Sequence, residues 1–206
     1  MPASANKAAQ LERIAEEIRQ LEESPLYAYR KEHGYLPVVG EGDPDARLMF
    51  IGEAPGKQEA ASGRPFVGRA GGVLDGLLES IGIDRQDLYI TNVVKDRPPD
   101  NRDPHVEEIE LYAPFLMRQI DIIEPEAIAT LGRFAMDFVL NRYDLPQQGR
   151  RISDLHGEVL KAEASYGKVA IVPLYHPAAT FYSHGLEEIM QKDFQVPKRL
   201  CHECQA

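Results

Sequence analysis

Apolar positions recur along the chain in two different patterns. Leu11, Ile14, Ile18 and Leu21 are three or four residues apart, which predicts an amphipathic helix over about residues 8–21. Four short apolar runs bounded by polar or turn residues predict buried strands: RLMFIG, DLYITNVV, EAIATLG and KVAIVPLYH. Stretches with helical spacing lie between them: AGGVLDGLLESIG, PHVEEIELYAPFLMRQIDII and RFAMDFVLNRY.

This alternation of strands and helices predicts an α/β fold. We expect a three-layer α/β/α sandwich around a central, mainly parallel four-stranded sheet. The length of 206 residues suits a single domain over 1–206, with an N-terminal helix in 1–24 and a flexible tail over 198–206. Ligands of such sheets bind beyond the carboxyl ends of the strands, and the polar motifs of this chain follow its predicted strands.

Composition excludes several classes of protein. No apolar stretch has the roughly 18 residues of a membrane span, and the N-terminus is acidic where a secretory leader would be apolar. We therefore expect a cytoplasmic monomer with no membrane partner. The two cysteines, Cys201 and Cys204, are too few for a disulfide framework, and with His202 they would supply at most half of a metal site. We expect no bound metal.

The charge pattern bears on a nucleic-acid partner. The net charge of −10 argues against general nucleic-acid affinity, because Lys and Arg supply most non-specific binding. A DNA enzyme nevertheless needs only a local positive face. Lys95, Arg97 and Arg102 surround a proline pair in TNVVKDRPPDNRDP, the densest basic patch of the chain. We interpret these cations as DNA phosphate contacts, with a solvated loop as the alternative.

Three further loops carry candidate chemistry. Asn92 ends a predicted strand, and its amide can both donate to and accept from a base edge such as that of uracil; a strand-end cap is the alternative. Phe66 and the acid Glu53 lie in GEAPGKQEAASGRPFVGRAG, which lacks the Lys and hydroxyl of a nucleotide-triphosphate loop. His176 follows the last strand, and Pro177 stiffens its loop. Taken singly, Phe66 fits a core aromatic equally well, and a lone histidine such as His176 is more often structural than catalytic.

In combination these motifs resemble a known family. GEAPG, PFVG, TNVVK followed by RPPDNRDP, LGRFA, LHG and HPAA have the order and approximate spacing of family 4 uracil-DNA glycosylases, the iron-sulfur type, from about Leu26 to Tyr182. The resemblance implies a monofunctional enzyme of base excision repair that acts on DNA containing uracil or another deaminated base. Such an enzyme extrudes the nucleotide and hydrolyses its N-glycosidic bond.

The resemblance also implies a role for each motif residue. His176 would donate a hydrogen bond to the uracil O2 as negative charge builds on the leaving base. Asn92 would pair with the uracil edge, and Phe66 would stack on the flipped base. Glu53 would orient the attacking water, with Asn101 as a second candidate for holding it. The remaining assignments are backbone contacts to the substrate by Gly52, Ala54 and Gly56, and a peripheral place for Glu59.

The chain departs from the family pattern after HPAA, where Leu-Leu-Arg is usual. It has Thr180, Phe181 and Tyr182 instead. We expect Phe181, together with Pro177, to contact DNA and to wedge between bases, and Tyr182 to stack where an Arg would bind phosphate.

A second departure concerns the family's four-iron cluster and its four cysteine ligands. The matching positions here hold Leu21, Ser24, Asp96 and Tyr112, and none of these is a thiolate. We therefore predict that the cluster is absent. The N-terminal segment would then be held by packing of Leu21 and by charge attraction between Asp96 and its neighbours in sequence, Lys95 and Arg97.

Two alternative functions remain open at this point. The substrate base is hypoxanthine or xanthine in the first, because Asn pairs with more than one carbonyl-rich edge. In the second the chain is a DNA-binding member of the superfamily that has lost turnover. The retention of Glu53, Asn92 and His176 argues against the second. The chain also lacks the basic, His-containing insertion near Phe66 of a DNA-crosslinking branch, so we expect no covalent adduct.

Overall fold

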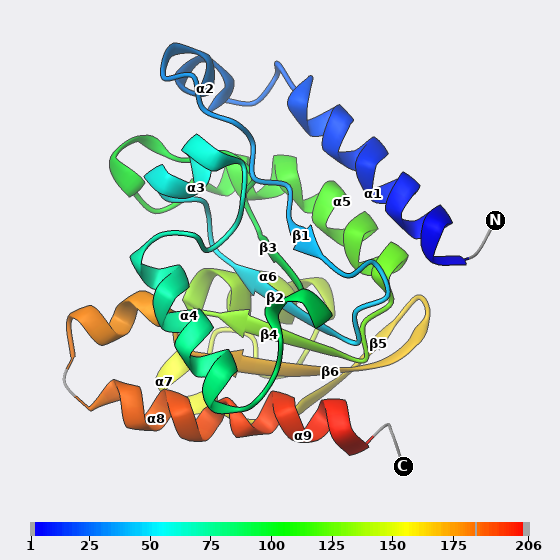
Figure 1. Cartoon of the computed structure of the whole chain (residues 1–206), viewed down its shortest axis with the longest axis vertical. Coiled ribbons are helices and arrows are strands. Elements are labelled where there is room, and N and C mark those ends of the chain that lie inside the picture. Colours follow the sequence, from blue (N-terminus) through cyan, green and yellow to red (C-terminus); the bar gives the residue numbers. More distant parts are fainter. Residues whose placement is uncertain (1–2, 184, 204–206) are drawn as a thin grey trace.

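A central sheet organises the protein, which is described by a computed structural model covering residues 3–183 and 185–203 (Figure 1). The sheet has six strands in the order β1-β3-β2-β4-β6-β5. Strands β3, β2, β4 and β6 run parallel, and β1 and β5 pair antiparallel at the two edges. The strands are β1 (Glu41–Gly42), β2 (Leu48–Gly52), β3 (Tyr89–Asn92), β4 (Ala127–Leu131), β5 (Leu160–Ala164) and β6 (Gly167–Leu174).

The predicted fold class is confirmed, and the four predicted strands form the parallel centre of the sheet. The predicted strand count is wrong, because two edge strands were missed. Strand β5 has the sequence LKAEA with alternating buried and exposed positions, so it lacks the continuous apolar run of an inner strand. Strand β1 has only two residues, too few for any sequence pattern.

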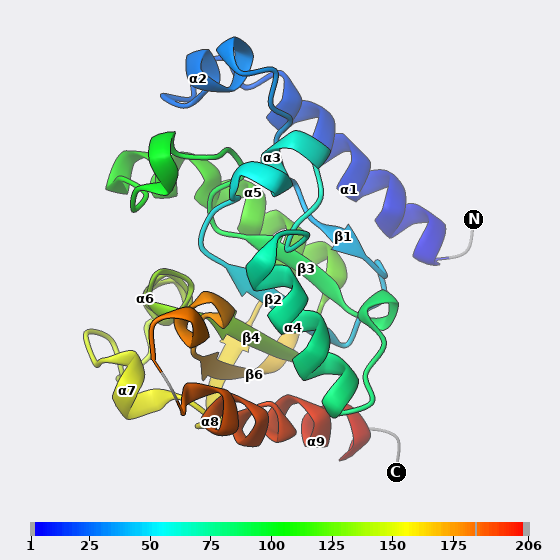
Figure 2. The same cartoon turned by 60° about the vertical axis from the view of Figure 1, so that its left-hand side comes forward.

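Helices cover both faces of the sheet. Figures 1 and 2 show α1 and α5 on one side and α8 and α9 on the other. The helices are α1 (Ala3–Arg19), α2 (Tyr27–Glu32), α3 (Lys57–Ser62), α4 (Arg69–Ser80), α5 (Val106–Ile123), α6 (Arg133–Arg142), α7 (Ile152–Leu155), α8 (Leu186–Asp193) and α9 (Gln195–Glu203); short 3-10 turns are η1 (Arg85–Asp87), η2 (Pro99–Asn101) and η3 (Pro177–Phe181).

Alternation along β2 shows how the sheet separates two apolar layers. Met49 and Ile51 pack in a cluster with residues of α1, α5 and α6. Leu48 and Phe50 point to the opposite face, into a cluster with residues of α4, α8 and α9. Because both faces of the sheet are covered, all five residues of β2 are buried.

The segment predicted as a flexible tail over 198–206 includes the end of helix α9. Helix α9 continues to Glu203, and its residues Val196 and Leu200 pack against the second apolar cluster, which holds the segment on the sheet. Cys204 lies outside the described residues. In the part of the chain that the structure describes, no helix is both long enough and apolar enough to cross a bilayer.

The parallel strands end together at one edge. Gly52 of β2 pairs in register with Asn92 of β3, and Leu131 of β4 pairs with Leu174 of β6. The loops that follow these strands therefore meet at this carboxyl edge, where the GEAPG, Asn92, Gly132 and His176 segments are found.

Candidate active site

The centre of the site is a close approach between Gly52, Asn92 and Phe66. A Cβ atom added at Gly52 would lie 2.4 Å from Oδ1 of Asn92 and 2.7 Å from Cζ of Phe66. Only glycine leaves room for both side chains. Three predicted site residues from separate loops thus share one small space at the end of β2.

The Asn92 side chain is only 2% exposed, yet no residue that the structure describes forms a hydrogen bond with its amide. The amide is not among the fully enclosed polar atoms without a partner, so a ligand can reach it, and it can both donate and accept. Its backbone carbonyl accepts a hydrogen bond from Nζ of Lys95 at 2.8 Å. The orientation of the strand end is therefore fixed, while the amide remains free to bind a substrate.

Lys95 is not on the surface, so the prediction that it contacts DNA phosphate is wrong. It is fully buried, and besides Asn92 its ammonium reaches Oγ1 of Thr91 at 2.7 Å and Oε1 of Gln119 at 2.6 Å. Burial without a carboxylate partner lowers the pKa of Lys95 well below its ordinary value. The Lys95 ammonium is therefore bound by polar acceptors on β3 and α5 and not by DNA.

Phe66 adopts an uncommon backbone conformation, with φ at +50°. Nη1 of Arg85 donates to the Phe66 carbonyl at 3.1 Å and so holds this conformation. The phenyl ring is 6% exposed, and its centroid lies 5.8 Å from that of the His176 imidazole. Phe66 therefore forms one wall of the space that Asn92 and His176 also line.

His176 is held as a neutral imidazole. The backbone N–H of Ala178 donates to its Nδ1 at 3.1 Å, so the proton of the neutral ring is on Nε2. Burial lowers the pKa of His176 to about 4, although the Glu59 carboxylate opposes the shift. A Cβ at Gly132, where φ is +91°, would lie 3.0 Å from Cβ of His176, so the glycine of the LGRFA motif makes room for this histidine.

Glu53 directly follows β2 and is partly exposed at the same edge of the sheet. Burial, together with the nearby Asp103 carboxylate, raises the pKa of Glu53 to about 7, although Arg133 opposes the shift. Asp103 and Arg133 form an ion pair of 3.1 Å with each other. A carboxyl group with a pKa near neutrality suits a proton acceptor.

Glu59 is not peripheral, contrary to the sequence-based expectation. Its side chain is 9% exposed, and Oε1 accepts the backbone N–H groups of Val67 at 3.0 Å and Gly68 at 2.8 Å. These contacts join the GEAPG loop to the loop that carries Phe66. Gly56, the N-cap of α3, is also close to Glu59, because a Cβ there would lie 2.7 Å from Oε2.

The predicted backbone contacts fall in the same loop. Gly52 is buried, Ala54 and Gly56 are partly buried, and Ala54 packs against the larger apolar cluster. All three therefore lie on the segment that joins β2 to α3 at the carboxyl edge.

Arg97 and Asn101 are hydrogen-bonded to each other. Nε of Arg97 donates to Oδ1 of Asn101 at 2.8 Å, and Nη1 of Arg97 donates to the hydroxyls of Tyr29 and Tyr35. Asn101 is exposed and has φ of +53°. The structure thus places Asn101 on the surface beside α2, with its amide oxygen already occupied.

Arg102 is also committed to an internal contact. Its guanidinium makes a two-pronged pair with the buried carboxylate of Glu108, at 2.6 and 2.9 Å. Oε2 of Glu108 in turn accepts the backbone N–H of His105, at the start of α5. Arg102 therefore anchors the beginning of α5, and the predicted phosphate contact would compete with this pair.

The η3 turn presents two exposed aromatic rings next to His176. Phe181 is 37% exposed and Tyr182 is 88% exposed. The guanidinium of Arg69 stacks over the Phe181 ring at 4.3 Å, while Pro177 is buried at the start of the turn. Arg69 is the first residue of α4, three residues after Phe66, so the Phe181 ring lies next to the segment that carries Phe66.

The four positions implied as cluster ligands do not fit an iron-sulfur cluster. The hydroxyls of Ser24 and Tyr112 lie 2.8 Å apart, and Tyr112 donates to Asp96 at 2.7 Å. Leu21 packs against the apolar cluster. Asp96 pairs with Arg30, not with Lys95 or Arg97 as predicted. Within residues 3–183 and 185–203, no three His, Cys, Asp or Glu side chains are grouped as a metal site.

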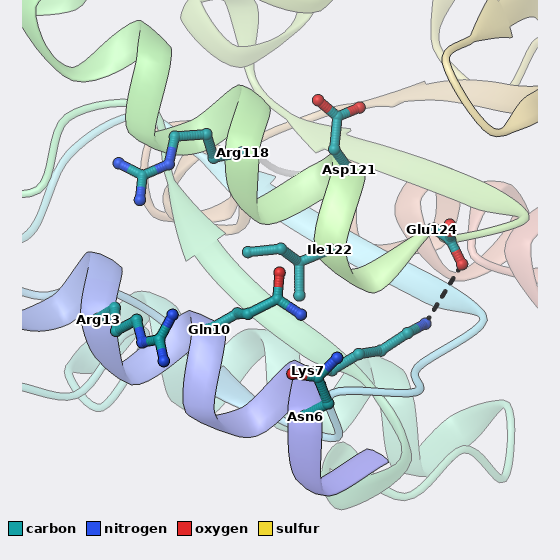
Figure 3. Close-up of a pocket in the computed structure, with 8 residues that line it drawn as sticks. All are labelled: Asn6, Lys7, Gln10, Arg13, Arg118, Asp121, Ile122 and Glu124. Atoms are coloured by element: carbon teal, nitrogen blue, oxygen red, sulfur yellow. Dashed lines mark ion pairs between the residues drawn. The ribbon is translucent and has the colours of Figure 1, made fainter. Parts of the chain in front are cut away.

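A separate groove lies between α1 and α5 (Figure 3). Its lining includes Lys7 and Glu124, which form an ion pair of 3.5 Å. Glu124 precedes β4, so this groove is at the amino edge of the parallel sheet, opposite the carboxyl edge. It contains none of the predicted site residues.

Sequence reasoning missed several residues that shape the site: Arg85, Asp103, Gly132 and Arg133. Gly132 and Arg133 stand in the LGRFA motif, so their place directly after a predicted strand was an available signal. Asp103 stands in the RPPDNRDP motif, which was also an available signal, whereas Arg85 lies in η1 and no local pattern identifies it.

Comparison with known proteins agrees with the motifs. A sequence model of the Uracil DNA glycosylase superfamily matches residues 39–196. The Type-4 uracil-DNA glycosylase of Archaeoglobus fulgidus is 42% identical over 93% of this chain and 93% of its own length. That of Sulfurisphaera tokodaii is 40% identical, over 92% and 84%, and that of Thermotoga maritima is 37% identical, over 91% and 93%. The chain therefore belongs to the uracil DNA glycosylase superfamily.

Proposed function

We propose that the protein releases uracil from DNA by hydrolysing its N-glycosidic bond, as a monofunctional enzyme of base excision repair. The observation that carries this proposal is the convergence of an unpartnered amide (Asn92), an aromatic ring (Phe66) and a neutral imidazole that donates through Nε2 (His176). A flipped uracil needs one group for its polar edge, one for its face and one for its O2 atom.

The reaction begins when the extruded uracil stacks on Phe66 and pairs with the amide of Asn92. The bond between C1′ and N1 then breaks, and its electron pair leaves with the base as a uracil anion. The Nε2–H of His176 donates to O2, a hydrogen bond that strengthens as the negative charge develops. A neutral imidazole suits this role, because it already carries the hydrogen that it donates and does not have to be protonated before each turnover.

Water completes the hydrolysis. It adds to C1′ of the positively charged sugar and gives its proton to the Glu53 carboxylate, which also stabilises the positive charge before the addition. The uracil anion then takes up a proton from solvent and Glu53 releases its proton to solvent, so the products are free uracil and an abasic site. Asn101 is the second proposed contact for this water, a role that requires its amide to leave Arg97 when DNA binds.

DNA binding is proposed for the rim of the pocket. Phe181 wedges into the stack that the uracil has left, and Tyr182 stacks on a neighbouring base. Arg97 and Arg102 contact phosphates after exchanging their present partners, whereas Lys95 has no part in DNA contact. We further propose that the enzyme works as a cytoplasmic monomer.

The decisive test is the release of uracil from a labelled oligonucleotide that contains one uracil. Abasic sites are cleaved with alkali, and the free base is identified by chromatography. Matched strands containing hypoxanthine, xanthine or thymine test the base preference, and the Asn92→Ala variant controls for contaminating glycosylases. Release of uracil by the wild type but not by the variant supports the proposal. Release of only hypoxanthine or xanthine would replace it, and binding without release of any base would leave a DNA-binding protein.

A further inference from the structure

We propose that a buried network of Ser24, Arg30, Asp96 and Tyr112 replaces the iron-sulfur cluster of this protein, so that the N-terminal helices and the loop after Asn92 are joined without iron. The link to catalysis rests on the proposed function; the structural part does not.

The centre of the network is an ion pair between Arg30 and Asp96. Nη1 of Arg30 lies 3.1 Å from both carboxylate oxygens, and the two side chains are 4% and 1% exposed. Arg30 also donates to the carbonyls of Ile18 and Arg19 at the C-terminal end of α1. The Ile18 carbonyl also accepts the backbone N–H of Leu21 at 3.3 Å. Both carbonyls lie at the negative end of the helix dipole, where a guanidinium is stabilising.

Ser24 and Tyr112 extend the network as a chain of hydrogen bonds that ends at the Asp96 carboxylate. Tyr112 donates its hydroxyl hydrogen to Oδ2 of Asp96 at 2.7 Å. Its oxygen is then left to accept, so the contact of 2.8 Å with Ser24 must use the Ser24 hydroxyl as donor. The Ser24 oxygen in turn accepts the backbone N–H of Leu26 at 3.2 Å. Ser24 and Tyr112 are 5% and 0% exposed.

The network joins segments that are far apart in the sequence. Arg30 belongs to α2, Ser24 to the connection between α1 and α2, Tyr112 to α5 and Asp96 to the loop after β3. Three of its members occupy positions where cysteine ligands were expected. A charged pair and two hydroxyls fill the space between these segments. Iron-sulfur clusters are usually held by thiolates, and none of the four expected ligand positions, Leu21 included, carries one.

The same network fixes the loop that carries Asn92. Asp96 is four residues beyond Asn92, and the residues on either side of Asp96 are held separately: Lys95 by the carbonyl of Asn92, and Arg97 by Tyr29 and Tyr35. Loss of the Asp96 anchor is therefore expected to disturb the position of the Asn92 amide as well as the packing of α1 and α2.

The first test is metal analysis of the full chain, purified from cells supplied with iron. We expect no stoichiometric iron or acid-labile sulfide, no visible absorption, and a thermal midpoint that a strong iron chelator or air oxidation leaves unchanged. Stoichiometric iron with sulfide, or a midpoint that falls on chelation, would overturn the proposal.

The second test is a double-mutant cycle of Arg30→Met and Asp96→Leu. Each single change leaves its partner buried and uncompensated, so we expect the unfolding equilibrium constant to rise more than about 100-fold. In the double variant the unfolding equilibrium constant should rise by a factor much smaller than the product of the two single factors. Independent, multiplicative effects would contradict the network.

The surface pair of Arg118 and Glu17 is the matched control, because it also joins α1 to α5 but is 45% and 47% exposed. Breaking it with Arg118→Met should change the unfolding constant less than about fivefold.

If the buried single variants do not fold, Tyr112→Phe removes one hydroxyl and keeps the ring. For this variant we expect a lower thermal midpoint and a lower kcat for uracil release with little change in KM. An unchanged midpoint would contradict the network, whereas a wild type that is free of iron but releases no uracil would overturn only the proposed function.

Discussion

The backbone N–H of Ala178 donates to Nδ1 of His176 at 3.1 Å and thereby fixes the tautomer of the imidazole. Burial lowers the pKa of His176 to about 4, so the ring is neutral near pH 7 and its one N–H is on Nε2. A donor with a fixed tautomer in an enclosed site needs no reorganisation as charge develops on the leaving base. The structure therefore leads to a specific expectation for this side chain.

Replacement of His176 by Ala should lower kcat for uracil release about 10- to 1000-fold, which corresponds to about 1.4–4 kcal/mol of transition-state stabilisation. Gln offers an N–H at a similar reach, so His176→Gln should retain more activity than His176→Ala. Single-turnover rates with saturating enzyme measure the effect directly. If both variants change only the affinity for DNA, His176 does not stabilise the departing anion.

The activity should rise with pH through the titration of Glu53. Burial raises the pKa of Glu53 to about 7, and the proposed role requires the carboxylate. His176 remains neutral over this range because its pKa is lowered to about 4. We therefore expect the single-turnover rate to increase from about pH 5.5 to 8 with an apparent pKa near 7, and Glu53→Gln to be slow and independent of pH. A Glu53→Gln profile that still rises would assign the titration to another group.

The same carboxyl group should make the stability of the protein depend on pH. Its pKa rises from 4.5 to about 7 on folding, so the folded state binds more protons and the free energy of unfolding falls as the pH rises through this interval. Glu53→Gln should therefore gain stability relative to the wild type between pH 4.5 and 7.5. Urea midpoints at the two pH values measure this gain, and subtracting the wild type cancels the contribution of His176. A constant difference between the two proteins would show that Glu53 is not desolvated.

The sequence predicted the parts of this structure that rest on local patterns. The strand patterns around Phe50, Ile90 and Val172 located the inner strands, because a covered parallel strand is a continuous apolar run. The motifs around Asn92 and His176 located the candidate site, because parallel strands bring their carboxyl ends to one edge.

The errors have a different physical origin. The sequence shows that Lys95 and Asp96 can carry charge, but not whether their side chains point to the interior or to the surface. Both point inward, where Gln119 and Arg30 meet them from helices 24 and 66 positions away in the sequence. Burial of a charge depends on such distant partners, so these two assignments could not come from local spacing.

The close approach at Gly52 offers a test of the pocket itself. In Gly52→Ala the new methyl group would lie 2.4 Å from Oδ1 of Asn92 and would displace either that amide or the Phe66 ring. We expect a large loss of uracil release, visible in kcat, from a protein that still folds. Gly72→Ala is the matched control, because a Cβ there has no neighbour within 4 Å and lies within α4. The control should keep full activity and gain about 0.5–1 kcal/mol of stability. Equal activity of the two variants would place the base elsewhere.

The burial of Lys95 predicts how DNA binding responds to salt. Lys95→Met keeps the length of the side chain but leaves Oε1 of Gln119 and the carbonyl of Asn92 without their donor, so it should cost about 1–3 kcal/mol of stability. The slope of the logarithm of the DNA-binding constant against the logarithm of salt concentration should not change, because a buried ammonium neutralises no phosphate. Arg97→Ala is the comparison, since a phosphate contact is proposed for Arg97, and its loss would make the slope shallower by about one unit. The same shallowing in Lys95→Met would mean that this lysine reaches DNA after all.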